Sequence, residues 1–168
     1  MYIKQEWLLK HKLFCSRIPL LKNVQLHVNS EQTGNITLPR GFMILSLLYP
    51  NLKYSQKGFH QDHMHPYSGF EEEKMDGLVL PDGSVIDDAT KEEWRRRRNT
   101  LANLQLLEGR ENESKNDTPL VDWLKAEENS ENAKYLPEGI SYELSNFEEF
   151  MEKRQELMSG ALKKILLC

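Results

Sequence analysis

Several features that would define a protein class are scarce or missing in this 168-residue sequence. It has only two cysteines, Cys15 and Cys168, and no Cys-x-x-Cys pair, so neither a disulfide framework nor a structural zinc site is indicated. The most apolar run, at residues 42–49, is too short to cross a bilayer. The N-terminus lacks the apolar core and cleavage site of a secretory signal, and we therefore expect a cytoplasmic protein.

The sequence also lacks an excess of positive charge. Its 22 Lys and Arg residues are outnumbered by 26 Asp and Glu residues, which gives a formal net charge of -4. Any contact with nucleic acid must therefore come from a local basic patch and not from a field over the whole protein. The composition, with 39% hydrophobic and 29% charged residues, otherwise suits a folded, polar domain.

Local patterns predict a mixed α+β fold. Residues 59–64 and 104–107 are predicted strands, and residues 42–49 form a buried segment that is either a helix turn or a strand. Thr90 and Ser145 are expected to begin helices, because each is followed three residues later by a glutamate, as in a capping box. The last helix carries apolar residues at helical spacing.

Four polar residues near the predicted strands form the candidate site: Asp62, His63, Asn103 and Asn112. Hydrolysis of a phosphodiester requires a group that takes a proton from the attacking water, and the neutral imidazole of His63 suits this role. It also requires a cation near the phosphate, and Asp62 and Asn112 offer hard oxygen atoms that suit Mg²⁺ or Mn²⁺. Asn103 can fix the loop between the strands by hydrogen bonds to backbone. We therefore predict His63 and Asn103 as catalytic residues and Asp62 and Asn112 as metal ligands.

The adjacency of Asp62 and His63 sets a condition on this site. Neighbouring residues on a strand point to opposite faces. The two side chains can therefore address metal and water separately only if the strand ends or kinks beside them, as Pro66 suggests.

Basic side chains near these motifs are candidates for contacts with nucleic acid. Four arginines occupy positions 95–98, just before Asn103. Such a run can hold phosphates, although it is equally typical of a solvated helix face. The predicted contact residues are Arg95, Arg96, Arg98, Lys115 and His65.

Taken in order, the motifs resemble those of HNH endonucleases, also called ββα-metal or His-Me finger nucleases. Asp-His-Met-His-Pro resembles the first motif, in which an acidic ligand precedes the catalytic histidine. Asn-Leu-Gln-Leu-Leu resembles the central asparagine motif, and Glu-Asn-Glu-Ser-Lys resembles the final helix motif. Residues 42–166 are similar to the C-terminal nuclease part of GmrSD-type modification-dependent restriction endonucleases.

This resemblance implies a Mg²⁺-dependent enzyme that cleaves DNA in a bacterial restriction system. It implies a small ββα-metal nuclease core with additional packed helices, in which the core helix begins near Asn112. We expect a linking segment at 1–41, a nuclease core at 42–128 with an insertion at 67–100, and a C-terminal helical segment at 129–168 that packs on the core. DNA is the implied partner. GmrSD-type enzymes also carry a nucleotide-hydrolysing N-terminal domain, and the absence of a Walker-type phosphate loop here would place it on a separate domain or subunit.

Two other interpretations stay open. The acidic net charge and the absence of that N-terminal domain favour a catalytically inactive module that keeps the fold and binds DNA or another partner. Alternatively, His60, His63 and His65 could bind zinc or iron together with Asp62. On an extended strand His60 would share a face with Asp62, and His65 with His63.

Overall fold

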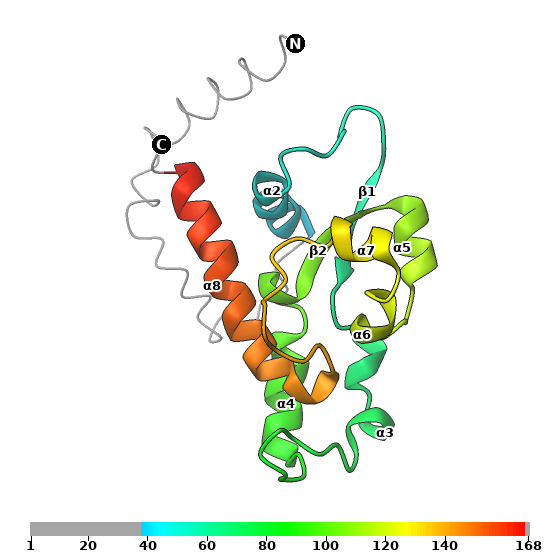
Figure 1. Cartoon of the computed structure of the whole chain (residues 1–168), viewed down its shortest axis with the longest axis vertical. Helices are drawn as coiled ribbons and strands as arrows, with labels where there is room; N and C mark the ends of the chain where they lie inside the picture. The colour runs from blue at the N-terminus through cyan, green and yellow to red at the C-terminus, as the bar shows by residue number, and fades with distance from the viewer. Residues whose placement is uncertain (1–37, 167–168) are drawn as a thin grey trace.

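The computed structural model describes residues 38–166, so most of the linking segment expected at 1–41 lies outside the described residues. Within this range the chain combines seven α-helices with one two-stranded antiparallel sheet, which confirms the predicted α+β class (Figure 1). No helix in the described part is both long and apolar enough to span a membrane.

The elements follow one another in mixed order. The strands are β1 (Phe59–His63) and β2 (Leu104–Glu108). The α-helices are α2 (Leu38–Leu48), α3 (Glu72–Met75), α4 (Asp88–Arg97), α5 (Gly109–Lys115), α6 (Leu120–Trp123), α7 (Glu127–Asn132) and α8 (Phe147–Leu166). Three short 3-10 helices separate them: η2 (Tyr67–Phe70), η3 (Leu101–Asn103) and η4 (Leu144–Asn146).

Both predicted strands are present and pair with each other. Asp62 lies opposite Gln105, and His63, the last residue of β1, lies opposite Leu104. The segment expected to be either a helix turn or a strand at 42–49 is helical and belongs to α2, which begins before the expected boundary at residue 42.

Helix α5 follows β2 without a loop. It begins at Gly109, earlier than the start predicted near Asn112. The reason is a capping box in which the side chains of Glu108 and Glu111 each bond to the other residue's backbone N–H. Asn112 is therefore an interior residue of the helix, one turn before Lys115.

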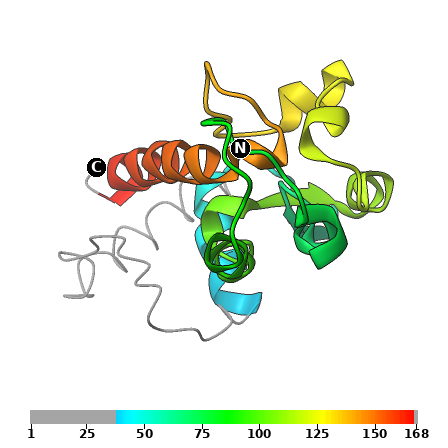
Figure 2. The same ribbon diagram turned by 90° about the horizontal axis from the view of Figure 1, so that it is seen from below.

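The two faces of the sheet contribute to different hydrophobic clusters. Leu104 and Leu106 pack with α2 and the C-terminal half of α8, whereas Leu107 packs with α6 and the N-terminal half of α8. Both views show α8 on one side of the strands and α5 on the other (Figures 1 and 2). The first cluster contains Leu45, Leu48, Tyr49, Leu101, Met158 and Leu162, and the second contains Met64, Phe70, Trp94, Leu120, Trp123, Phe147, Phe150 and Met151.

The starts of α4 and α8 differ from the prediction. Helix α4 is capped by Asp87, whose carboxylate accepts a hydrogen bond from the Thr90 N–H at 2.7 Å, so Thr90 lies inside the helix. Ser145 lies in η4 and α8 begins at Phe147. In α4 the capping residue stands three positions before the expected one, and local pattern alone does not decide between such candidates.

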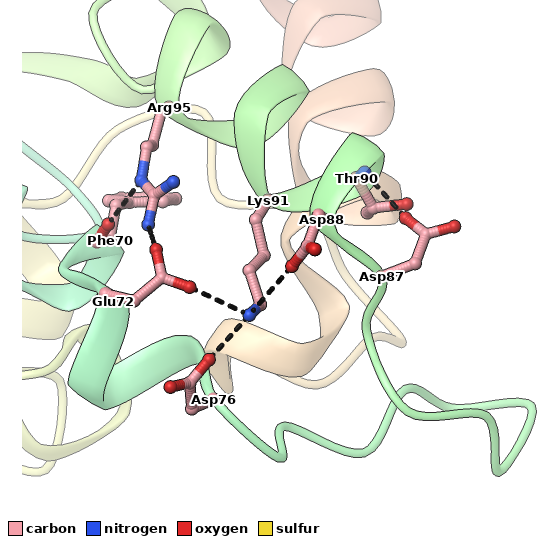
Figure 3. A network of polar contacts seen from close by, with 8 residues as sticks. All are labelled: Phe70, Glu72, Asp76, Asp87, Asp88, Thr90, Lys91 and Arg95. Atoms are coloured by element: carbon pink, nitrogen blue, oxygen red, sulfur yellow. Dashed lines mark hydrogen bonds and ion pairs between the residues drawn. The ribbon is translucent and has the colours of Figure 1, made fainter.

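A network of charged groups joins α4 to η2 and α3 (Figure 3). The Lys91 side chain is only 8% exposed, and its ammonium lies 3.0 Å from Glu72, 2.5 Å from Asp76 and 3.3 Å from Asp88. Arg95 pairs with Glu72 and donates from Nε to the Phe70 carbonyl at 3.1 Å. Hydrogen bonds from Lys91 and Arg95 lower the pKa of the Glu72 carboxyl to about 2. The insertion expected at 67–100 is thus held by ion pairs as well as by apolar packing.

Candidate active site

Asn103 is the central structural residue of the candidate site. Its side chain is fully buried, and its Oδ1 accepts from the His65 N–H at 2.9 Å. Its Nδ2 donates to the His65 carbonyl at 3.0 Å and to the Arg98 carbonyl at 2.9 Å. One amide therefore holds the chain just after β1 and the end of α4 in a fixed relation to β2.

Arg154 of α8 fixes the backbone around Asn103. The guanidinium is fully buried and donates to the carbonyl of Ala102 at 2.5 Å and to that of Leu104 at 3.0 Å. These two residues flank Asn103 in the chain. A third contact, at 3.4 Å, goes to the Lys134 carbonyl. The position of the site asparagine thus depends on a helix that begins more than forty residues later in the sequence.

Asp62 projects from β1 toward α5. Its Oδ2 accepts from Gln105 Nε2 at 2.9 Å and lies 3.1 Å from the ammonium of Lys115. Gln105 is the residue directly opposite Asp62 in the sheet, so the first contact follows from the strand register. The Asp62 side chain is 11% exposed, which makes this carboxylate nearly buried and hydrogen-bonded.

Lys115 does not lie where it could reach a nucleic acid. Its side chain is fully buried, and besides Asp62 it donates to the His63 carbonyl at 2.5 Å. Its ammonium also lies 5.7 Å from the centre of the Trp123 ring. Burial lowers the pKa of Lys115, and the negative charge of Asp62 acts in the opposite direction. The predicted phosphate contact by Lys115 is replaced by a structural role, in which the ammonium joins α5 to the end of β1.

His63 points away from this pair. Its Nε2 lies 2.9 Å from Oδ1 of Asn99, and its ring meets the Tyr67 ring edge-on at 6.0 Å between centroids. An amide oxygen only accepts hydrogen bonds, so this contact is satisfied by the imidazole tautomer that carries its proton on Nε2. Strand β1 ends at His63. This meets the condition that the strand must end beside Asp62 and His63 if one side chain is to address a metal and the other a water molecule.

The oxygen atoms of Asp62 and Asn112 are of the type that binds a magnesium ion which keeps most of its water. Asn112 lies one turn before Lys115 on α5, and residues at that spacing share a helix face. Its side chain is partly exposed. Mg²⁺ commonly binds through one or two protein oxygens and several waters. Asp62 and Asn112 are the residues that would hold such an ion, and the Lys115 ammonium, 3.1 Å from Asp62, would compete for the carboxylate.

His65 is a core residue. It is 2% exposed, and its ring lies edge-on to Phe147 and Phe150, with ring centroids 5.5 Å and 4.7 Å away. Burial, with smaller contributions from Lys115 and Arg154, lowers its pKa to about 3. It therefore cannot contact nucleic acid as predicted. Within residues 38–166, no group of three or more His, Cys, Asp or Glu side chains comes together in a way that could hold a metal ion.

The four arginines at positions 95–98 have different partners. Arg95, whose side chain is 27% exposed, binds Glu72 and the Phe70 carbonyl. Arg96 is half-exposed and pairs with Glu93 at 2.6 Å, and Arg97 pairs with Glu148 at 3.4 Å. Arg98 contacts Tyr67 and no carboxylate in the described part of the chain.

Three residues of the site were not found from the sequence: Gln105, Asn99 and Tyr67. Gln105 could have been found, because a residue opposite Asp62 follows from the strand register once the two strands are paired. Asn99 lies in the turn after α4 and Tyr67 is the first residue of η2, and no spacing pattern marks their contacts with His63.

Comparison of the sequence with models of protein families found no match, and neither did comparison with curated proteins.

Proposed function

We propose that this chain is a metal-dependent endonuclease of the HNH (ββα-metal) type that hydrolyses phosphodiester bonds of DNA. One observation carries the proposal. The Asn103 side chain holds the chain directly after the strand that ends in Asp62 and His63, and the paired strand leads at once into the helix that carries Asn112. This order of strand, loop, strand and helix is what the resemblance to HNH nucleases requires of these motifs.

In this proposal His63 accepts the proton of the attacking water. Asn99 holds the imidazole through Nε2. With the proton on Nε2, the lone pair of Nδ1 is the one that would accept the proton of water. Asn103 positions the backbone on which His63 depends and takes no part in proton transfer.

Asp62 and Asn112 are the proposed ligands of Mg²⁺ or Mn²⁺. When bound, the ion would offset the negative charge that develops on the phosphate and on the leaving oxygen. Its approach to Asp62 requires that the carboxylate be shared with Lys115 or released by it. The proposed biological setting, a bacterial system that restricts foreign or modified DNA, follows from the resemblance to GmrSD-type nucleases, as does a nucleotide-hydrolysing partner.

The test is cleavage of supercoiled plasmid in the presence of Mg²⁺ or Mn²⁺. The intact protein should nick the plasmid, EDTA should stop the reaction, and His63→Ala should lower the rate at least a hundredfold. His60→Ala is the matched control, because His60 is an exposed histidine of the same strand and should leave the rate unchanged. Equal rates in the intact protein and in His63→Ala would contradict the assignment of His63.

The pairing of Asp62 with Lys115 favours a second candidate, a catalytically inactive module with the same fold. An internal ammonium that already neutralises the proposed ligand leaves less negative charge for a divalent ion. A folded protein that binds DNA but neither binds Mn²⁺ nor cuts plasmid would establish this alternative.

A further inference from the structure

The arginines at positions 95–98 are not equivalent, and their partners separate one from the rest. Arg95, Arg96 and Arg97 each pair with a glutamate, so their positive charges are already offset. Figure 3 shows the Arg95 guanidinium directed at Glu72 and the Phe70 carbonyl. Within residues 38–166, Arg98 forms no ion pair with a carboxylate.

Arg98 is instead held by an aromatic ring. Its guanidinium carbon lies 3.6 Å from the centre of the Tyr67 ring, and Nη2 donates to the Tyr67 hydroxyl. Stacking on a ring restricts the guanidinium without neutralising it. Nε is buried without a partner in the described part of the chain, so the donors left for a ligand are those of Nη1 and the second N–H of Nη2. Tyr67 itself is 49% exposed, so the pair lies at the surface.

The same pair lies beside His63. The edge of the Tyr67 ring meets the His63 imidazole, and Asn99, the residue after Arg98, bonds to that imidazole. The Arg98 carbonyl accepts from Asn103, so the backbone of this segment is fixed relative to β1. An oriented, uncompensated guanidinium therefore lies one aromatic ring away from the proposed base.

We propose that Arg98, stacked on Tyr67, binds a phosphate group of DNA beside His63, and that the other three arginines do not. A planar guanidinium with several free N–H donors matches the oxygen atoms of a phosphodiester. The inference rests on the proposed function for its choice of DNA as ligand, but it is tested by binding and not by cleavage.

The experiment measures fluorescence anisotropy of a short labelled DNA duplex with the full chain in EDTA, where no cutting occurs. Arg98→Ala should weaken the affinity about tenfold and reduce the slope of log K against log salt by about one. Arg96→Ala is the matched control. It also removes one arginine charge, but that charge is already paired with Glu93, so the affinity should change less than twofold. Arg98→Lys keeps the charge and loses the planar stack, and it should show an intermediate loss.

Three outcomes overturn the inference: no binding by the intact protein, equal losses in Arg98→Ala and Arg96→Ala, or unchanged affinity in Arg98→Ala. If Arg98→Ala fails to fold, as judged by circular dichroism, Tyr67→Ala provides a second test and should also weaken binding severalfold. Binding that depends on Arg98 without any plasmid cleavage would refute the nuclease proposal and leave this site standing. An Arg98→Ala variant that cleaves plasmid and binds DNA with normal affinity would refute the Arg98 site and leave the nuclease proposal standing.

Discussion

The side-chain amide of Asn103 is bonded to both polar groups of one residue, accepting from the His65 N–H at 2.9 Å and donating to the His65 carbonyl at 3.0 Å. In this contact the Asn103 side chain bonds to the N–H and the carbonyl of His65, as the backbone of a neighbouring strand does in an antiparallel sheet. It continues the β1–β2 connection past the end of β1, where Met64 N–H also donates to the Asn103 carbonyl at 2.7 Å. The loop after His63 is therefore tied to Asn103 by three hydrogen bonds.

Asn103→Asp should be strongly destabilising although the side chain keeps its shape. The variant loses both donated hydrogen bonds and places a carboxylate against the His65 and Arg98 carbonyls. A buried, partly unsatisfied charge of this kind costs about 3 kcal/mol or more. Urea denaturation measures the loss, and Asn51→Asp, at an exposed turn, is the control that should change stability little. Equal stability of the two variants would contradict the role given to Asn103.

Asn99→Ala should lower the cleavage rate about tenfold and leave KM nearly unchanged, because the ring of His63 loses the partner that orients it. Asn99→Asp retains an acceptor oxygen and should keep more of the rate. Nitrogen chemical shifts of the His63 ring provide a readout that does not depend on activity. The intact protein should show the proton on Nε2, and Asn99→Ala should show a mixture of the two tautomers. A proton on Nδ1 in the intact protein would refute the orientation described here.

Lys115→Met should have opposite effects on folding and on metal binding. Removing the ammonium leaves the nearly buried Asp62 carboxylate without its ionic partner, which should cost about 3 kcal/mol of stability in EDTA. The same change removes the competitor for the carboxylate, so Mn²⁺ should bind more tightly and restore part of the stability. A titration followed by electron paramagnetic resonance measures the affinity. Asp62→Asn is the control and should weaken binding, and equal affinities in Lys115→Met and the intact protein would exclude a shared site.

The buried His65 should make folding sensitive to acid. Its pKa falls from 6.5 to about 3, chiefly through burial, so the unfolded chain binds a proton that the folded chain rejects between these values. Stability therefore falls as the pH decreases from about 6.5 toward 3, by at most about 1.4 kcal/mol per pH unit from this group. His65→Leu should flatten the pH dependence of the unfolding free energy in that window. His60→Leu, at an exposed position, should not, and identical slopes in the intact protein and His65→Leu would contradict this prediction.

Local sequence patterns were sufficient for the elements nearest the site. The strands at Phe59–His63 and Leu104–Glu108 were anticipated within a residue at each end, because the alternation of side chains along a strand is a property of adjacent residues. The boundaries of α4, α5 and α8 were less accurate. Several polar residues near each helix start can cap it, and the surrounding structure selects among them.

The sequence by itself determined the α+β composition, the strand positions and the presence of Asp62 and His63 at the end of a strand. Only the tertiary structure decided which polar residues lie inside. Lys115 meets the His63 carbonyl across 52 positions of the chain, and His65 meets aromatic residues of α8. Polar side chains are usually exposed, so both were expected at the surface. Their burial becomes favourable only when a distant segment supplies a carboxylate, a carbonyl or a ring edge, and such partners have no signature in the neighbouring sequence.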